Sequence, residues 1–335
     1  MAVLQRGAEA PSLSDPSGWR RAGLLLAVVA VAAVGLRLLQ GAAVPQLQTF
    51  LLVFTSLLIE AFPFILLGAL VSAAIEVFVP ARWFARLAGM PRAVQMPVAG
   101  LGGFAFPVCE CGSIPVARRL IRKGMTPAAA ITFMLAAPIL NPVVLVATAV
   151  AYSGRGLALQ MVLARAGLAL VVALAVGWVV GRRSRTDILR SPSDPADHDP
   201  HERRARAFFT HLASDFLFLG RYLVIGAAAA GLLQTFVPQS FIGAVAGTPV
   251  LSIVSMMVLA AVLSLCSESD AFVAASFVQF GPASQLAFLV FGPMVDAKLV
   301  ALYAGTFGRG VLRAVVVTAA TVTLAGTLWL EVALG

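Results

Sequence analysis

Long apolar segments alternate with short polar ones along most of this chain. A helix needs about 20 mostly apolar residues to cross a membrane. Apolar segments near this length run over residues 22–40, 48–77, 127–151, 157–181, 211–236, 284–306 and 311–333. Two further apolar segments, 93–122 and 249–279, are each interrupted by glycines or by a short polar string. The pattern predicts an all-α polytopic membrane protein in which two helical segments are broken.

Composition supports the same class. Of the 335 residues, 60% are hydrophobic and 12% are charged, whereas a soluble domain is about half apolar and a quarter charged. The net charge of +9 comes from basic runs beside apolar segments, such as Arg20-Arg21, Arg118-Arg119 and Arg182-Arg183. Basic residues at span ends mark cytoplasmic loops. We therefore expect the lipid bilayer as a partner and no nucleic acid.

Short motifs recur in the two halves of the chain at a slowly drifting offset. The matched motifs are Phe78-Val79-Pro80 with Phe236-Val237-Pro238, Cys109 with Cys266, Pro138-Ile139-Leu140-Asn141 with Pro293-Met294-Val295-Asp296, and Gly154-Arg155 with Gly308-Arg309. An internal duplication explains such an ordered series. It predicts a first transmembrane repeat over 45–181, a cytoplasmic linker over 182–210 and a second repeat over 211–335.

The region before the repeats is expected to contain a cytoplasmic tail, residues 1–21, and an extra transmembrane helix, residues 22–44. The alternative is that Leu24–Leu39 belongs to a cleaved signal peptide, because small residues follow it. The length of this apolar run and its Arg37 favour a retained span.

Loop charge suggests how the repeats are oriented. If the basic segments 81–92 and 118–123 lie on one side, segment 93–122 enters the membrane and returns. The nearly uncharged segments 237–248 and 279–284 imply the same for 249–279 from the opposite side. We therefore expect two inverted repeats, each with a broken or re-entrant helical hairpin near the midplane. The alternative is that both broken segments cross fully.

All three cysteines lie in the two polar strings, Cys109-Glu110-Cys111-Gly112-Ser113 and Cys266-Ser267-Glu268-Ser269-Asp270. Thiolates are soft ligands that bind copper(I), zinc and similar thiophilic centres. We interpret Cys109, Cys111 and Cys266 as substrate-binding residues, which are metal ligands if the substrate is a metal. The alternative is that these cysteines pack as small buried hydrophobic residues.

Four carboxylates in apolar surroundings are candidates for proton coupling: Glu110, Glu268, Asp270 and Asp296. Ionisable groups at membrane depth are costly and usually functional, and burial favours the protonated form of a carboxyl group. Lys298, two residues from Asp296, could neutralise it if the helix unwinds there, and Arg165 is expected to face the protein interior.

Two polar residues have a structural and a functional interpretation. Ser113 is a candidate substrate contact, but it and Ser269 could instead cap half-helices. Asn141 lies between prolines inside an apolar segment, as its match Asp296 follows Pro293. Proline frees a backbone carbonyl one turn earlier, and each of these side chains could bond that carbonyl or line the solute cavity, where Asn141 would contact the substrate.

Phe106-Pro107-Val108-Cys109-Glu110-Cys111-Gly112-Ser113-Ile114-Pro115, followed by Ala136-Ala137-Pro138-x-x-Asn141-Pro142, resembles the ArsP-type permease family, which includes YraQ-like permeases. The resemblance covers about residues 45–330. It implies a multi-pass transporter of the bacterial inner membrane, without a cofactor, that exports a thiophilic solute. A trivalent organoarsenical is the first candidate, and copper or zinc is the alternative. We expect proton-coupled antiport.

Other classes of protein fit less well. A membrane thiol oxidoreductase would need a Cys-x-x-Cys pair or a bound cofactor, and an assembly protein would not need paired thiols and carboxylates. The Gly-x-x-x-x-Gly-Lys-Ser/Thr pattern of ATP-binding loops does not occur in the sequence, so energy would come from a proton gradient or a partner. A homodimer is left open.

Overall fold

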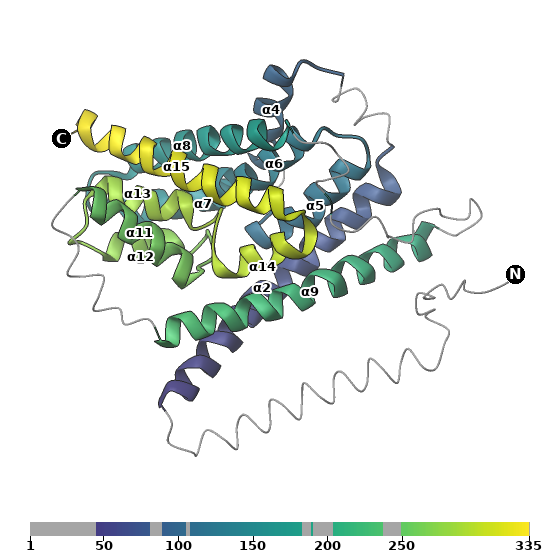
Figure 1. Ribbon diagram of the computed structural model, residues 1–335, viewed down its shortest axis with the longest axis horizontal. Helices are drawn as coiled ribbons and strands as arrows, with labels where there is room; N and C mark the ends of the chain where they lie inside the picture. The colour runs from purple at the N-terminus through teal and green to yellow at the C-terminus, as the bar shows by residue number, and fades with distance from the viewer. Residues whose placement is uncertain are drawn as a thin grey trace, which may run out of the picture.

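The structure is a computed structural model that describes residues 45–80, 89–104, 108–182, 189, 204–236 and 249–334. Within this part it is helical (Figure 1). The helices are α2 (Pro45–Phe78), α4 (Arg92–Leu101), the 3-10 helix η1 (Gly102–Phe104), α5 (Glu110–Arg122), α6 (Pro127–Leu140), α7 (Pro142–Ser153), α8 (Ala158–Val180), α9 (Arg204–Phe236), α11 (Pro249–Leu263), α12 (Asp270–Ser276), α13 (Pro282–Phe291), α14 (Ala297–Thr306) and α15 (Arg309–Leu334). No β-strand occurs in the described ranges, where an isolated bridge joins Leu189 and Phe307. The expected tail 1–21 and extra helix 22–44, and most of the linker 182–210, lie outside the described residues.

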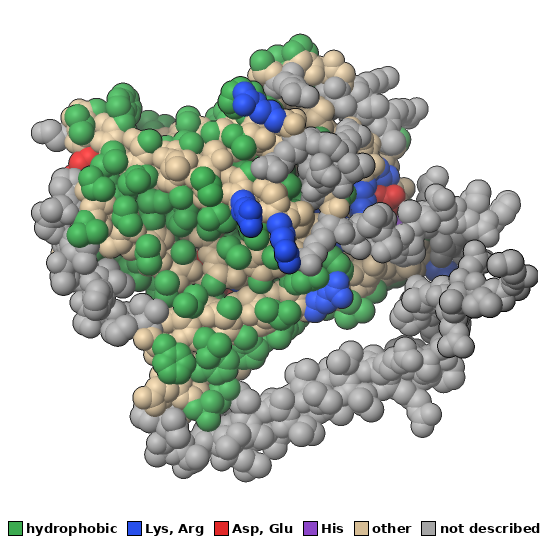
Figure 2. Space-filling view, in the orientation of Figure 1, with side chains coloured by type: hydrophobic (Ala, Val, Ile, Leu, Met, Phe, Trp, Pro, Cys, Tyr) green, Lys and Arg blue, Asp and Glu red, His purple; other side chains and the backbone are tan. Residues whose placement is uncertain are grey.

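The long helices have the length and composition of membrane spans. Four of them qualify alone, namely α2, α8, α9 and α15, and the bent pair of α6 and α7 makes a fifth if it is one span. Large apolar side chains face outward, among them Ile59 at 74% exposure and Trp329 at 70%. Figure 2 shows hydrophobic side chains spread over the visible face. Lipid would cover such a surface, and the prediction of an all-α polytopic membrane protein is confirmed.

The helices of the second half follow the same order as those of the first. The series α2, α4, α5, α6, α7 and α8 is repeated as α9, α11, α12, α13, α14 and α15. The matched helices α2 and α9 pack antiparallel (Figure 1), with Phe50 beside Gly231 at one end and Phe78 beside Phe208 at the other. Opposite directions of matched helices are what an inverted duplication predicts. The orientation of the repeats in a membrane stays a prediction.

Two segments that are continuous in the apolar pattern are broken helices. The first breaks between α6 and α7, which meet at Asn141 with a bend of 40°. Asn141 precedes Pro142, and the residue before a proline is displaced from helical geometry. The second breaks between α13 and α14, over residues 292–296. Both breaks place a polar side chain, Asn141 or Asp296, at the start of the next helix.

The interpretation of residues 118–123 as a charged loop is wrong. Residues 118–122 belong to α5, and Arg118 and Arg119 are only 6% and 4% exposed. Arg119 Nη2 lies 3.0 Å from Asp215 Oδ2 on α9, so its charge is compensated inside the protein. The loop-charge argument for a re-entrant 93–122 segment therefore loses one of its supports, although the break in that segment is observed.

Candidate functional site

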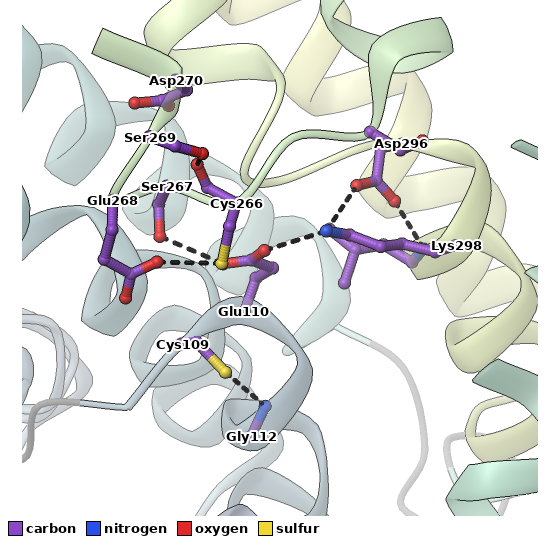
Figure 3. Close-up of polar contacts among 12 residues, drawn as sticks. Cys109, Glu110, Gly112, Cys266, Ser267, Glu268, Ser269, Asp270, Asp296 and Lys298 are labelled. Carbon is purple, nitrogen blue, oxygen red and sulfur yellow. Dashed lines mark hydrogen bonds and ion pairs between the residues drawn. The ribbon is translucent and has the colours of Figure 1, made fainter. Parts of the chain in front are cut away.

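The two polar strings meet at the junction of the two halves (Figure 3). Ser267, in the connection between α11 and α12, donates a hydrogen bond from Oγ to Glu110 Oε2 at 3.0 Å. Glu110 is the first residue of α5. These residues are 157 positions apart, which is the offset between Cys109 and Cys266. The duplication therefore brings equivalent positions of the two halves into contact.

The first string begins in extended backbone and continues into α5. Cys109 is the N-cap residue, with φ −73° and ψ 172°, and its Sγ accepts a hydrogen bond from Gly112 N at 3.3 Å. Cys111 is buried in the first turn of the helix. A Cβ atom at Gly68 of α2 would lie 2.4 Å from the Gly112 Cα atom. The two glycines thus allow α2 to hold the N-terminus of α5 by direct backbone contact.

The second string follows a strained residue. Ser264, just after α11, has a φ of +49°, a left-handed conformation that costs a non-glycine residue about 1–3 kcal/mol. Cys266 Sγ donates to Glu268 Oε2 at 2.9 Å, and Ser269 Oγ donates to the Cys266 carbonyl at 3.1 Å. Helix α12 then begins at Asp270. The chain is non-helical across this string, as the interrupted apolar pattern predicted.

Lys298 links the first string to the second half. Its Nζ lies 3.2 Å from Glu110 Oε1 and 3.6 Å from Asp296 Oδ2. Asp296 Oδ1 accepts a hydrogen bond from Leu299 N at 2.6 Å and so caps α14. The expectation that Lys298 could neutralise Asp296 agrees with this geometry, but the closer carboxylate is Glu110.

Asp270 has a different cationic partner. Arg165 of α8 is fully buried, and its Nη2 lies 2.6 Å from Asp270 Oδ2. The same guanidinium donates to Thr148 Oγ1 at 2.7 Å and to the Ser267 carbonyl at 3.4 Å. Arg165 thus faces the protein interior, as predicted, and it holds both Asp270 and the backbone of the second string.

Three potential metal-ligating groups converge in the described part of the chain. Ligand atoms of Glu110, Cys266 and Glu268 all lie within 4.8 Å of one another. Cys109 and Cys111 are not members of this cluster, although both are buried free thiols near it. The predicted set of three cysteines is therefore divided between one thiol beside two carboxylates and two thiols on the N-terminus of α5.

The remaining predicted residues have local structural contacts. Asn141 is the N-cap of α7, and its Oδ1 accepts a hydrogen bond from Val143 N at 3.0 Å, so it bonds an amide of the next helix and not the predicted carbonyl. Ser113 Oγ donates to the Glu110 carbonyl at 2.9 Å. Ser269, at the N-cap position of α12, makes no capping bond with its side chain. Side-chain caps are therefore observed at Asn141 and Asp296, for which capping was not predicted, whereas the capping predicted for Ser113 and Ser269 is not observed.

Ser267 is the site residue that sequence reasoning missed. Its position in the second string was noted, but no role was given to its hydroxyl. The signal was present, because the duplication offset aligns Ser267 with Glu110. At this junction the equivalent positions of the two halves contact each other, which makes Ser267 a partner of the Glu110 carboxylate.

Fold and site together define a polytopic helical membrane protein with a buried polar site at broken helices, an arrangement common in transporters. The chain belongs to the ArsP_1 family of predicted permeases, whose family model matches residues 46–330. This result confirms the resemblance read from the first polar string.

Two relatives cover most of the chain. The UPF0718 protein YcgR of Bacillus subtilis (strain 168) is 40% identical over 281 residues, which are 82% of this chain and 95% of that protein. A Streptococcus mutans protein, named putative two-component membrane permease complex subunit, is 37% identical over 254 residues, covering 74% and 83%. No solved structure matches the chain.

Proposed function

We propose that this permease exports a thiophilic solute across the bacterial inner membrane through the junction of the two polar strings. The observation that carries the proposal is the convergence of Cys266 with Glu110 and Glu268, whose ligand atoms lie within 4.8 Å of one another. These groups come from both halves of the chain. Motion of one half against the other would therefore assemble or separate the ligands, which is what an alternating-access mechanism needs.

The mixed donor set favours a divalent transition-metal ion of the zinc class as solute. Zinc binds both thiolate sulfur and carboxylate oxygen, whereas copper(I) prefers sulfur ligands alone. Three protein ligands leave a coordination position for water or for an incoming ligand, so the ion can exchange. Binding would also release the proton of the Cys266 thiol, because a metal-ligating cysteine is a thiolate.

A trivalent organoarsenical is the second candidate, and the positions of Cys109 and Cys111 favour it. Both are free thiols, both are buried, and they are separated by one residue at the N-terminus of α5. An arsenical with one carbon substituent has two positions for thiolates, which these cysteines would fill. Ser113 and Asn141 are further contacts proposed for either solute.

The thiols of the site are buried in the described conformation, while Glu268 is partly exposed. Cys109, Cys111 and Cys266 are 4%, 2% and 5% exposed, so no solute reaches the thiols without movement of the surrounding helices. The unwound second string and the extended start of α5 are the segments proposed to move. Irregular backbone at such a place is stable only where protein or a cavity covers it.

Proton-coupled antiport is proposed as the energy source. Of the four candidate carboxylates, Glu110 and Asp296 share Lys298, and Asp270 is paired with Arg165. Glu268 has no basic partner among the described residues and is hydrogen-bonded by Cys266. We therefore assign the proton exchange mainly to Glu268. The name of the Streptococcus relative refers to a two-component complex, so a second subunit is the other proposed energy source; a homodimer stays a prediction.

Transport into inside-out vesicles tests this function. With an acidic interior, vesicles that contain the protein should accumulate Zn²⁺ or Cd²⁺ faster than empty vesicles, because inward solute movement is exchanged for outward protons. Methylarsenite and Cu⁺ are the competing solutes. Glu268→Gln should keep transport down a solute gradient but lose its dependence on the pH gradient. If none of these solutes accumulates in vesicles with correctly inserted protein, the proposed function is wrong.

A further inference from the structure

Lys298 is a buried cation placed between two carboxylates at the edge of the proposed solute site. Its side chain is 3% exposed, and its Nζ lies 3.2 Å from Glu110 Oε1 and 3.6 Å from Asp296 Oδ2 (Figure 3). Its backbone is held by α9, since a Cβ atom at Gly226 would lie 2.7 Å from the Lys298 Cα atom. Because the backbone is fixed and the four-carbon side chain is flexible, the ammonium group can reach either the Glu110 or the Asp296 carboxylate.

Asp296 has an unused acceptor for this ammonium group. Its Oδ1 accepts the capping bond from Leu299 N, but Oδ2 is buried and has no hydrogen-bond partner among the described atoms. A shift of about 1 Å would bring Lys298 Nζ from 3.6 Å to the 2.7–2.9 Å of a charge-assisted hydrogen bond with that oxygen. A buried acceptor without a partner is costly, so the protein already contains a favourable second position for Lys298.

The ionisable groups around the site have a net negative charge, which favours binding of a cation. Glu110, Glu268 and Asp296 with Lys298 make three carboxylates and one ammonium, a formal excess of two negative charges when all are ionised. Asp270 and Arg165 cancel each other. Unpaired buried charge costs several kcal/mol per ion. Because metal binding also ionises the Cys266 thiol, a divalent cation would reduce the excess to one negative charge, whereas a neutral solute would leave it.

We propose that the Lys298 ammonium group is a built-in counter-ion. It pairs with Glu110 when the site is empty and moves to Asp296 when a divalent metal ion binds Glu110, Cys266 and Glu268. The inference rests on the metal-ion version of the proposed function and extends it to a residue outside the ligand cluster. Lys298 acts as a positioning residue, because it competes with the solute for Glu110 without being a ligand. Asp296 sets the free energy of that exchange by receiving the displaced ammonium group.

The test is Cd²⁺ binding to the purified full-length protein in detergent, measured by calorimetry and by the ultraviolet absorption of the cadmium–thiolate bond. Asp296→Asn removes the acceptor for the displaced Lys298, so Cd²⁺ should bind at least tenfold more weakly. Adding Lys298→Met to that variant removes the competitor, so affinity should return to the level of the unmutated protein or exceed it. A merely structural role of the pair predicts the opposite, namely that the second substitution weakens binding further.

Glu76→Gln is the matched control, because Glu76 of α2 is an ion-paired carboxylate that contacts Arg119 near the other end of α5, at 23% side-chain exposure. It should leave Cd²⁺ affinity unchanged. Unaltered affinity in Asp296→Asn, weaker binding in the double variant than in Asp296→Asn, or no Cd²⁺ binding by the unmutated protein would each overturn the inference. Coupled Cd²⁺ binding without vesicle transport would instead keep the role of Lys298 and reject the proposed function.

Discussion

Helix α5 has a cluster of buried charges at each end, and the two clusters differ in backbone regularity, hydrogen bonding and the sign of their excess charge. At its N-terminus, Glu110 meets Lys298, Ser267 and the neighbouring thiols. Towards its C-terminus, Arg119 and Arg118 meet Asp215 of α9, and Arg119 also meets Glu76 of α2. We call these the junction cluster and the arginine cluster.

The arginine cluster is regular and densely bonded. Its backbone is helical on all three elements, and Asp215 Oδ2 accepts from both Arg119 Nη2 at 3.0 Å and Ser72 Oγ at 2.7 Å. Lys123 Nζ donates to the Glu76 carbonyl at 2.6 Å and lies 3.7 Å from the Glu76 carboxylate. Basic groups outnumber acidic ones there. Such a network fixes α5 against α2 and α9.

The junction cluster has the opposite properties. Its second string is unwound, Ser264 is strained, and two carboxylate oxygens, Asp270 Oδ1 and Asp296 Oδ2, lack hydrogen-bond partners among the described atoms. Acidic groups outnumber basic ones, and thiols lie among them. The two clusters therefore differ in hydrogen bonding, in backbone regularity and in the sign of their excess charge. These differences support the proposal that the junction cluster is the functional site and the arginine cluster a structural one.

The largest effect on stability is expected from the arginine cluster. Asp215→Asn leaves Arg118 and Arg119 buried without their shared carboxylate, which should lower the free energy of unfolding by about 3–5 kcal/mol. Thermal unfolding in detergent would measure it. Arg182→Met, which removes only an exposed guanidinium stacked on Trp178, is the control and should cost about 1 kcal/mol or less. An Asp215→Asn protein as stable as the unmutated one would remove the distinction between the clusters.

At the junction cluster, substitutions should change Cd²⁺ affinity more than they change stability. Cys266→Ser removes the thiol of the ligand set. Loss of an outer-shell partner typically lowers metal affinity about 10–100-fold, so the loss of this direct ligand should lower Cd²⁺ affinity by more than that. Cys109→Ser and Cys111→Ser should change it only a few-fold, because these thiols lie outside the cluster. Unfolding temperatures should change little in all three. The reverse order of effects would support the organoarsenical candidate.

The smallest effect on stability and on Cd²⁺ affinity is expected from a substitution at the contact between α2 and the start of α5. Gly68→Ala puts a methyl group 2.4 Å from Gly112 Cα, so the two backbones must separate. Overpacking of this kind costs about 1–3 kcal/mol, and here it should also weaken Cd²⁺ binding by displacing Glu110. Gly154→Ala is the control, since a Cβ atom there meets nothing within 4 Å. Equal behaviour of the two variants would show that this contact does not position the junction cluster.

Local sequence determined much of this protein. Apolar length predicted the four long helices α2, α8, α9 and α15, but also predicted 127–151 and 284–306 as continuous helices, which the structure breaks. The polar strings predicted the breaks before α5 and α12, and the motif Asn141-Pro142 marks the start of α7. The family could also be predicted, because its motif is a short continuous string. These features depend on residues close together in the chain, and helix length, proline geometry and capping act over a few residues.

Tertiary structure alone decided which charges meet. Residues 118–123 have the composition of a cytoplasmic loop, and Arg119 becomes an interior residue because Asp215, 96 positions away, lies beside it. Glu110 also pairs with Lys298, which is 188 residues away in the sequence. The sequence likewise placed three cysteines in two strings without indicating that only Cys266 joins the carboxylates. Burial of a charge is stable only with a partner, and that partner is set by the packing of distant helices.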